Sequence, residues 1–258
     1  MESWTQNVRL SFMETDLKSG FWKIHHFRRS YPRNVYELTA HASILKPGGI
    51  PHEPHTHAEE ELIVILAGSV EIITPDWEMK PAPSAPMGPG SIVYHDSNRA
   101  HTIHSVGSQP AVYVCLKWTG KRARKRVRPL QPSLFFPEYE TMKNSNPFQT
   151  KTIFESPTDF LTNLHCHMSL LQPGAGYDPH KDAHDVLIIV LDGEVETLGQ
   201  RVGPKGIIFY RAGEPHGMKN VGDIRARYVV FEFHRQGKVF KGFWKLARLA
   251  RVLARKIR

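Results

Sequence analysis

The chain has 258 residues, of which 40% are hydrophobic and 23% are charged. This balance is typical of a folded globular protein and excludes disordered, collagen-like and membrane-spanning classes. The length allows one large domain or two small ones. The net charge is +9, but the surplus is concentrated at Lys121–Arg128 and at residues 235–258. The charge therefore indicates basic appendages on a slightly acidic body.

Two features indicate the compartment. The two cysteines, Cys115 and Cys166, both lie in apolar, strand-like runs, which favours a reducing environment. The N-terminus carries acidic residues and no long apolar run, so we do not expect a signal peptide. We expect a cytoplasmic protein.

The sequence contains an internal repeat. Residues Pro54–Ile72 align without a gap with Pro179–Thr197, and Tyr36–Gly49 resembles Thr162–Gly174. Both copies contain short runs of Val, Ile and aromatic residues bounded by Gly and Pro, a pattern typical of β-strands. The duplication predicts two small antiparallel barrels or jelly rolls in tandem.

The repeat divides the chain into five expected parts. These are an N-terminal arm (1–34), a first barrel (35–118), a basic linker with several prolines (119–150), a second barrel (151–235) and a C-terminal helix (236–258). In residues 238–258 apolar side chains recur at spacings of three and four with Lys and Arg on the other faces, which predicts a basic amphipathic helix. Such a helix binds an anionic membrane surface or packs on the barrels, and both alternatives stay open. We do not expect nucleic-acid binding, because no recognised nucleic-acid motif accompanies the basic residues.

A metal site is predicted in the first repeat. In an extended strand alternate side chains share a face, so His55, His57 and Glu61 are expected to converge on the barrel interior. Two imidazoles and a carboxylate are ligands for a divalent transition metal. The segment Gly88–Gly107 is expected to form a turn, a strand, a polar turn and another strand, and it supplies His101 as a fourth ligand.

These motifs resemble those of the cupin superfamily. Its first motif has the spacing from Gly49 through His55, His57 and Glu61 to Gly68, and its second has a Gly-led strand, a turn and a histidine. The resemblance implies an all-β fold of two tandem cupin barrels, with His55, His57, Glu61 and His101 as the metal ligands. The second motif departs from the family pattern, because His95 stands where proline is usual and Ser105 where asparagine is usual.

Three further residues are candidates for catalysis in the first repeat. Glu59 is expected on the ligand face, where it serves as a general base or orients a histidine. Tyr94 and Arg99 flank the second motif, and either position the substrate or are ordinary strand and turn residues.

The second repeat keeps only part of the ligand set. The alignment places His180 at the position of His55, Asp182 at that of His57, and Val186 at that of Glu61. Its residues offer an alternative second metal site at His180, Asp182, His184 and His216, or else this repeat serves only stability.

These observations lead to two hypotheses on function. The first is a metal-dependent enzyme (a dioxygenase, isomerase, decarboxylase or lyase) whose Mn, Fe, Zn, Ni or Cu ion acts on a small anionic acid or sugar by Lewis-acid or oxygen-activating chemistry. The second is a non-catalytic ligand-binding or regulatory protein. Either could lie at the cytoplasmic face of the membrane in envelope polysaccharide metabolism if the C-terminal helix binds lipid. Exposed barrel edges also allow a homodimer.

Overall fold

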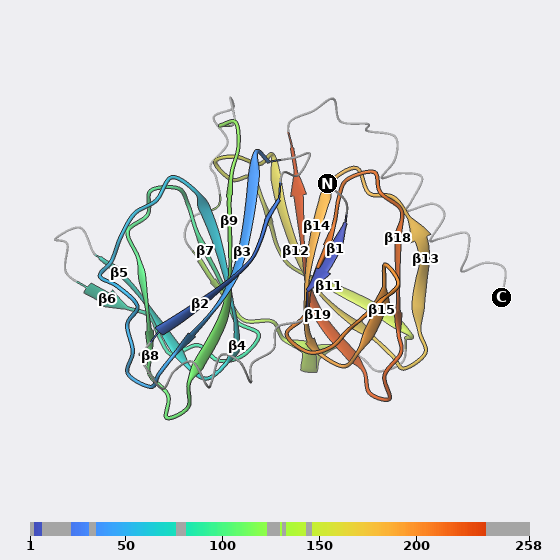
Figure 1. The fold of residues 1–258 in the computed structure, drawn as a ribbon, viewed down its shortest axis with the longest axis horizontal. Coiled ribbons are helices and arrows are strands. Elements are labelled where there is room, and N and C mark those ends of the chain that lie inside the picture. Colours follow the sequence, from blue (N-terminus) through green and yellow to red (C-terminus); the bar gives the residue numbers. More distant parts are fainter. Residues whose placement is uncertain are drawn as a thin grey trace.

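The computed structural model describes residues 3–6, 22–30, 35–75, 81–122, 130, 133–142 and 146–235, and only the backbone of 6, 22–30 and 81–82. Within these ranges the regular structure is β-strand, apart from one short 3-10 turn at Tyr139–Thr141. The strands form two units, each with a large and a small sheet, and all strand pairs are antiparallel. Figure 1 shows the two large sheets facing each other at the centre and the small sheets on the outer sides.

The N-terminal unit contains nine strands. Its six-stranded sheet has the order β10 (Ser133–Phe135), β7 (Ile92–His95), β4 (Glu60–Ala67), β9 (Ala111–Thr119), β3 (Glu37–Leu45) and β2 (Trp22–Ser30). Its small sheet has the order β6 (Pro81–Pro83), β5 (Val70–Pro75) and β8 (Thr102–Ser105).

The C-terminal unit repeats this plan. Its six-stranded sheet has the order β1 (Trp4–Gln6), β17 (Ile207–Tyr210), β14 (Asp185–Asp192), β19 (Ala226–His234), β12 (Asn163–Leu171) and β11 (Phe148–Ser156). Its small sheet has the order β13 (Gly176–His180), β18 (His216–Asn220), β15 (Val195–Thr197) and β16 (Gln200–Val202). The prediction of two tandem β-barrels is therefore confirmed.

The first strand of the chain belongs to the second unit. β1 pairs with β17, so that Trp4 lies opposite Phe209 and their rings stack at 5.7 Å between centroids. The backbone N–H and hydroxyl of Ser3 both donate to Glu214 Oε2, at 2.6 Å each. β1 and β2 thus both come from the range 1–34, but β1 extends the C-terminal sheet and β2 the N-terminal one.

The same tight turn in both units reflects the duplication. Gly68 and Gly193 follow β4 and β14, with φ of 72° and 74°. A Cβ would lie 2.5 Å from the Pro110 carbonyl oxygen at Gly68 and 2.7 Å from Ala226 Cα at Gly193. Both turns therefore require glycine, for its backbone conformation and for the close approach of the next strand.

The strands at the centre separate two kinds of core. In β4, Ile63 and Ile65 join the core of their own barrel, whereas Leu62 and Val64 join a core shared by both units. Trp118 of β9 meets Phe233 of β19 edge to face in the shared core, at 5.3 Å between ring centroids. Because side chains alternate along a strand, each central strand contributes to its own barrel and to the contact between barrels.

Glu60 is a fully buried carboxylate at the contact between the units. It accepts hydrogen bonds from the Tyr94 hydroxyl at 2.9 Å and from Trp118 Nε1 at 2.6 Å. From the second unit it accepts one from the Thr158 hydroxyl at 2.9 Å and one from the Asp159 backbone N–H at 2.6 Å. Burial raises the pKa of Glu60 to about 7, against the opposing effect of these donors. Glu60 therefore connects the two barrels through hydrogen bonds to residues of both.

Two predictions lie outside the described residues. The C-terminal helix at 236–258, with its membrane alternative, falls wholly beyond them, as does most of the basic run Lys121–Arg128. Among the residues that the structure does describe, no helix is long and apolar enough to cross a membrane.

Candidate metal centre

The segment before β4 holds the first two predicted ligands. Pro51 and Pro54 have no backbone N–H and so cannot continue a ladder here. His55 instead forms an isolated bridge with His101, through a 3.1 Å hydrogen bond from its N–H and a 3.2 Å bond in return. The strand expected from His55 to Glu61 begins only at Glu60, and this bridge brings the loop to His101.

Three of the predicted ligands form one close group. His57, Glu61 and His101 each offer a ligand atom, and these atoms lie within 4.8 Å of one another. Glu61 Oε2 lies 3.6 Å from His57 Nε2 and 2.5 Å from His101 Nε2. Glu61 and His101 are buried, so the group is largely screened from solvent.

Backbone carbonyls orient both imidazoles of this group. His57 Nδ1 lies 3.1 Å from the Glu59 carbonyl oxygen, and His101 Nδ1 lies 2.8 Å from that of Arg99. A carbonyl only accepts, so Nδ1 carries a proton in each ring, and Nε2 is the nitrogen that faces Glu61 and is placed to bind a metal ion. A hydrogen bond of this kind at the other ring nitrogen prepares a histidine to bind a metal ion.

His55 lies beside this group rather than inside it. Its ring centroid is 5.5 Å from those of both His57 and His101. Burial, and then the nearby His52 and His101, lower the pKa of His55 to about 4. The imidazole is therefore neutral near pH 7, which is the form that binds a metal ion.

Glu61 uses its two oxygens differently. Oε1 accepts from the Cys115 thiol at 2.5 Å and lies 3.4 Å from Lys117 Nζ, while Oε2 faces the histidines. Burial alone raises the pKa of Glu61, but the adjacent imidazoles of His101 and His57 and the charge of Lys117 hold it well below its usual range. Glu61 is therefore an anion at neutral pH.

The donor set fits a divalent transition metal. His55 Nδ1, His57 Nε2 and Glu61 Oε2 are buried atoms without a hydrogen-bond partner. Buried polar atoms are normally paired, so orphan atoms on neighbouring side chains favour a missing partner. Nitrogen and carboxylate oxygen suit zinc, manganese, iron, nickel or copper.

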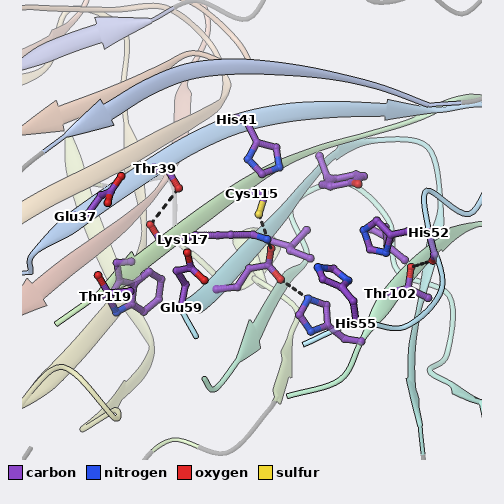
Figure 2. A pocket seen from close by; sticks show the side chains of 16 residues that line it. Glu37, Thr39, His41, His52, His55, Glu59, Thr102, Cys115, Lys117 and Thr119 are labelled. Carbon is purple, nitrogen blue, oxygen red and sulfur yellow. Dashed lines mark hydrogen bonds and ion pairs between the residues drawn. The ribbon is translucent and has the colours of Figure 1, made fainter. Parts of the chain in front are cut away.

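A cavity of about 430 Å³ opens beside the group. Figure 2 shows its wall, where His52 and His55 lie on one side and Glu37, Thr39 and Thr119 on the other, with Lys117 between them. The volume is suited to a small molecule. His41 and Cys115 also line this cavity.

The three predicted catalytic residues have different surroundings. Glu59 lines the cavity, with its carboxylate 3.6 Å from His57 Nδ1. The structure does not bring Tyr94 to the cavity, because Tyr94 points into the shared core and donates to Glu60. Arg99 Nε donates to Asp96 at 3.1 Å, so the side chain of Arg99 is held at its own turn.

Sequence reasoning missed two neighbours of the metal group. Lys117 lies directly across the ladder from Glu61, and so does His95 on the other side. His95 is buried, stacks on His101 with 3.9 Å between centroids, and leaves both ring nitrogens without a hydrogen-bond partner. Strand register would have revealed both residues, but register is not visible in the sequence before the strands are paired.

The second repeat divides the four residues predicted as an alternative site. His180, Asp182 and His216 come together, with Asp182 Oδ2 at 3.6 Å from His180 Nε2 and 3.2 Å from His216 Nε2. His184 belongs to a different group, with Glu232 and His234. The reason is that β13 ends at His180 and β14 begins at Asp185, so residues 181–184 form a turn rather than one strand face.

Comparison with known proteins agrees with this geometry. Residues 42–117 match the family model of the cupin domain, and no curated protein sequence matches the chain. The match spans strands β3 to β9, including all four predicted ligands of the first barrel.

Three solved structures have a similar fold. A protein of Pseudomonas aeruginosa described as glyoxylate-induced is 12% identical with a TM-score of 0.63, over 86% of this chain and 84% of that one. A cupin 2 conserved barrel domain protein from Leptotrichia buccalis is 14% identical with a TM-score of 0.57, over 90% and 97%. Bacillus subtilis oxalate decarboxylase, described with Mn(II) centres, is 12% identical with a TM-score of 0.56, over 92% and 74%.

The family match and the fold together define a cupin domain within this chain. Residues 42–117 form its cupin domain, and the chain as a whole has the cupin fold with two barrels in tandem. The resemblance inferred from the histidine motifs is confirmed.

Proposed function

We propose that the N-terminal barrel binds one divalent transition-metal ion through His55, His57, Glu61 and His101. The observation that carries the proposal is the orientation of His57 and His101, whose Nδ1 atoms are fixed by backbone carbonyls while both Nε2 atoms face Glu61 Oε2. Such an ion supplies a Lewis acid, or an oxygen-activating centre if it is iron or manganese.

The proposed substrate is a small, oxygen-rich anion such as a carboxylic acid or a sugar acid. The adjoining cavity of about 430 Å³ fits a molecule of this size. Lys117 lies on its wall, and its ammonium group, 3.4 Å from Glu61, is placed to bind a second oxygen of a molecule held at the metal. Fold relatives described as oxalate decarboxylase and as glyoxylate-induced support an acid of a few carbons.

Glu59 is the proposed general base or acid. Its side chain is 41% exposed, so its carboxylate reaches the solvent and the cavity. Its backbone carbonyl also holds His57, so replacing the side chain leaves that contact in place. Glu59→Gln therefore separates a proton-transfer role from the orientation of the ligand.

A non-catalytic ligand-binding protein is the alternative. For the C-terminal half it is supported by Val186, a residue that cannot ligate, at the position of Glu61 in the second repeat. In this alternative the N-terminal barrel binds the metal and the small anion but converts nothing.

The test begins with metal content, measured by mass spectrometry on protein purified without a histidine tag. We expect His57→Ala to contain one equivalent less than the unaltered chain, and the matched control His104→Ala, whose side chain faces Glu71 instead, to contain the same amount as the unaltered chain. Oxalate, glyoxylate and sugar acids are then added to the metal-loaded protein, with product formation and oxygen uptake recorded. Equal metal content in His57→Ala and the unaltered chain would contradict the site, and anion binding without turnover would favour the alternative.

A further inference from the structure

The two barrels differ at four equivalent positions. In the N-terminal barrel Thr39, Glu59, Lys117 and Thr119 all line the cavity. The alignment places His184 at the position of Glu59. Glu232 takes the position of Lys117, because it lies opposite Val186 as Lys117 lies opposite Glu61. His165 takes the position of Thr39, because it pairs with Glu232 as Thr39 pairs with Lys117. His234, two residues after Glu232, takes the position of Thr119. In the second barrel the positions of these four cavity-lining residues are thus occupied by three histidines and a carboxylate: His165, His184, His234 and Glu232.

In the second barrel the carboxylate lies on the strand next to the one that carries Glu61 in the first barrel. Val186 lacks the carboxylate that Glu61 provides in the first barrel, but Glu232 on the neighbouring strand β19 is its direct cross-strand partner. Residues directly opposite in an antiparallel ladder lie about 4.5–5.5 Å apart. The second barrel thus keeps a carboxylate near the same interior point.

His184 and His234 converge on one oxygen of this carboxylate. Glu232 Oε2 lies 3.2 Å from His184 Nε2 and is hydrogen-bonded to His234 Nε2 at 3.0 Å. The two rings stack with 4.1 Å between their centroids. The other oxygen faces elsewhere, since Glu232 Oε1 is 3.9 Å from His167 Nδ1.

These distances match those between ligands of one ion. Two atoms that each lie about 2.1 Å from a metal are separated by roughly 3.0–3.4 Å at octahedral to tetrahedral angles. His184 Nε2 is buried and forms no hydrogen bond, although Glu232 Oε2 is 3.2 Å away. Its lone pair and the oxygen are therefore not aimed at each other, which is expected of two atoms directed at a third point between them.

The backbone of His234 is held by hydrogen bonds from Thr162. Both the backbone N–H and the hydroxyl of Thr162 donate to the His234 carbonyl oxygen, at 2.9 and 3.0 Å. The side chains of His184, Glu232 and His234 are 12%, 16% and 19% exposed. The group is thus held in place, yet it remains open enough for an ion to enter.

We propose that His184, Glu232 and His234 form a second divalent transition-metal site in the C-terminal barrel, distinct from the group at His180, Asp182 and His216. Two imidazole nitrogens and one carboxylate oxygen suit zinc, cobalt, manganese or iron, and leave positions open for water. The competing explanation for the same contacts is an ion pair between a protonated histidine and Glu232.

The test uses cobalt(II) alone as the probe, because its visible absorption reports the geometry of a bound ion. It is titrated into the full chain after removal of metal by a chelator, in a His57→Ala background that silences the first barrel. We expect one equivalent in His57→Ala, none after adding Glu232→Gln, and one after adding Asp182→Asn as the matched control. Comparison of His57→Ala with the unaltered chain reports the first site separately, so failure there is distinguishable.

Three outcomes would overturn the proposal. They are no cobalt in His57→Ala, an unchanged spectrum after Glu232→Gln, or loss of the same ion after Asp182→Asn. Near-ultraviolet circular dichroism checks that each variant is folded. If Glu232→Gln is not, His234→Gln, at the end of its strand, replaces it with the same expected loss.

Discussion

Lys117 and Glu232 stand at the same position of the duplicated sheet and carry opposite charges. Each lies directly across the ladder from the residue at which the first cupin motif places its carboxylate: Glu61 in one barrel and Val186 in the other. In the first barrel the ammonium group of Lys117 neutralises part of the charge of Glu61. In the second barrel the carboxylate belongs to Glu232 on β19, the strand that pairs with the strand of Val186. Together with the changes at the three neighbouring positions, this exchange gives the second barrel a cluster of histidines around a carboxylate where the first barrel has a cavity wall.

Lys117 is expected to serve the substrate rather than the metal. In Lys117→Met the metal content should stay near that of the unaltered protein, because the other contacts of Glu61 remain. Binding of a small dicarboxylate such as oxalate to the metal-loaded protein should weaken about tenfold or more, since a charge-assisted hydrogen bond contributes about 1.5–3 kcal/mol. Calorimetric titration with oxalate measures this. Unchanged affinity would show that Lys117 only balances the charge of Glu61.

Glu60 is expected to be a large determinant of stability. Glu60→Ala leaves the Tyr94, Trp118 and Thr158 donors without their acceptor at the contact between barrels. Unsatisfied buried groups cost about 1–3 kcal/mol each, so we expect a loss of roughly 3 kcal/mol or more in the free energy of unfolding by urea. Glu196→Ala, at an exposed position, is the control and should change stability by less than about 0.5 kcal/mol. Equal stability of the two variants would refute this role.

The N-terminal strand is expected to stabilise the distant C-terminal barrel. Trp4 is buried against Phe209, and its replacement by alanine removes this stacking and leaves a cavity. The expected cost is about 3–5 kcal/mol, typical of a buried tryptophan. Ile224→Ala, whose side chain is 62% exposed, should unfold like the unaltered chain. Thermal unfolding of the three proteins decides the matter, and a melting temperature unchanged in Trp4→Ala would contradict the prediction.

His95 is expected to be replaceable without loss of fold. Its two nitrogens are buried without hydrogen bonds, and burial lowers the pKa of His95 to about 3. In His95→Phe a ring of similar shape keeps the stacking on His101 and removes two unsatisfied polar atoms. Unfolding at pH 7 should show equal or higher stability, with the metal content unchanged. A loss of metal would instead identify His95 as a further ligand.

The sequence is informative about the fold for physical reasons. The ungapped repeat, the turns at Gly68 and Gly193 and the runs of Val and Ile encode two copies of one barrel, and local patterns of this kind are visible without a structure. His57, Glu61 and His101 were identified because a known motif spacing contains them. The pairing of β1 with a strand of the second barrel was not predictable, because the partner of a short strand depends on the tertiary arrangement.

The parts of the site that escaped prediction all depend on strand pairing. Lys117, His95 and Glu232 lie beside the ligands only because particular strands are neighbours in a particular register. His184 was grouped with Asp182 on the assumption of one continuous strand, and the turn at 181–184 sends its side chain to Glu232 instead. The role of Tyr94 depends on which face of β7 meets the other barrel, which the sequence of one barrel does not reveal.

The shared core makes each barrel depend on the other for its stability. Trp118, Leu62, Phe231 and Phe233 lie in one cluster to which both barrels contribute. A first barrel released alone, during synthesis or after cleavage of the chain, would expose Trp118 and the buried carboxylate of Glu60 to water. Such a half would be prone to aggregation and proteolysis, and the proposed metal ligand Glu61, next to Glu60 on the same strand, would lose its support at the same moment.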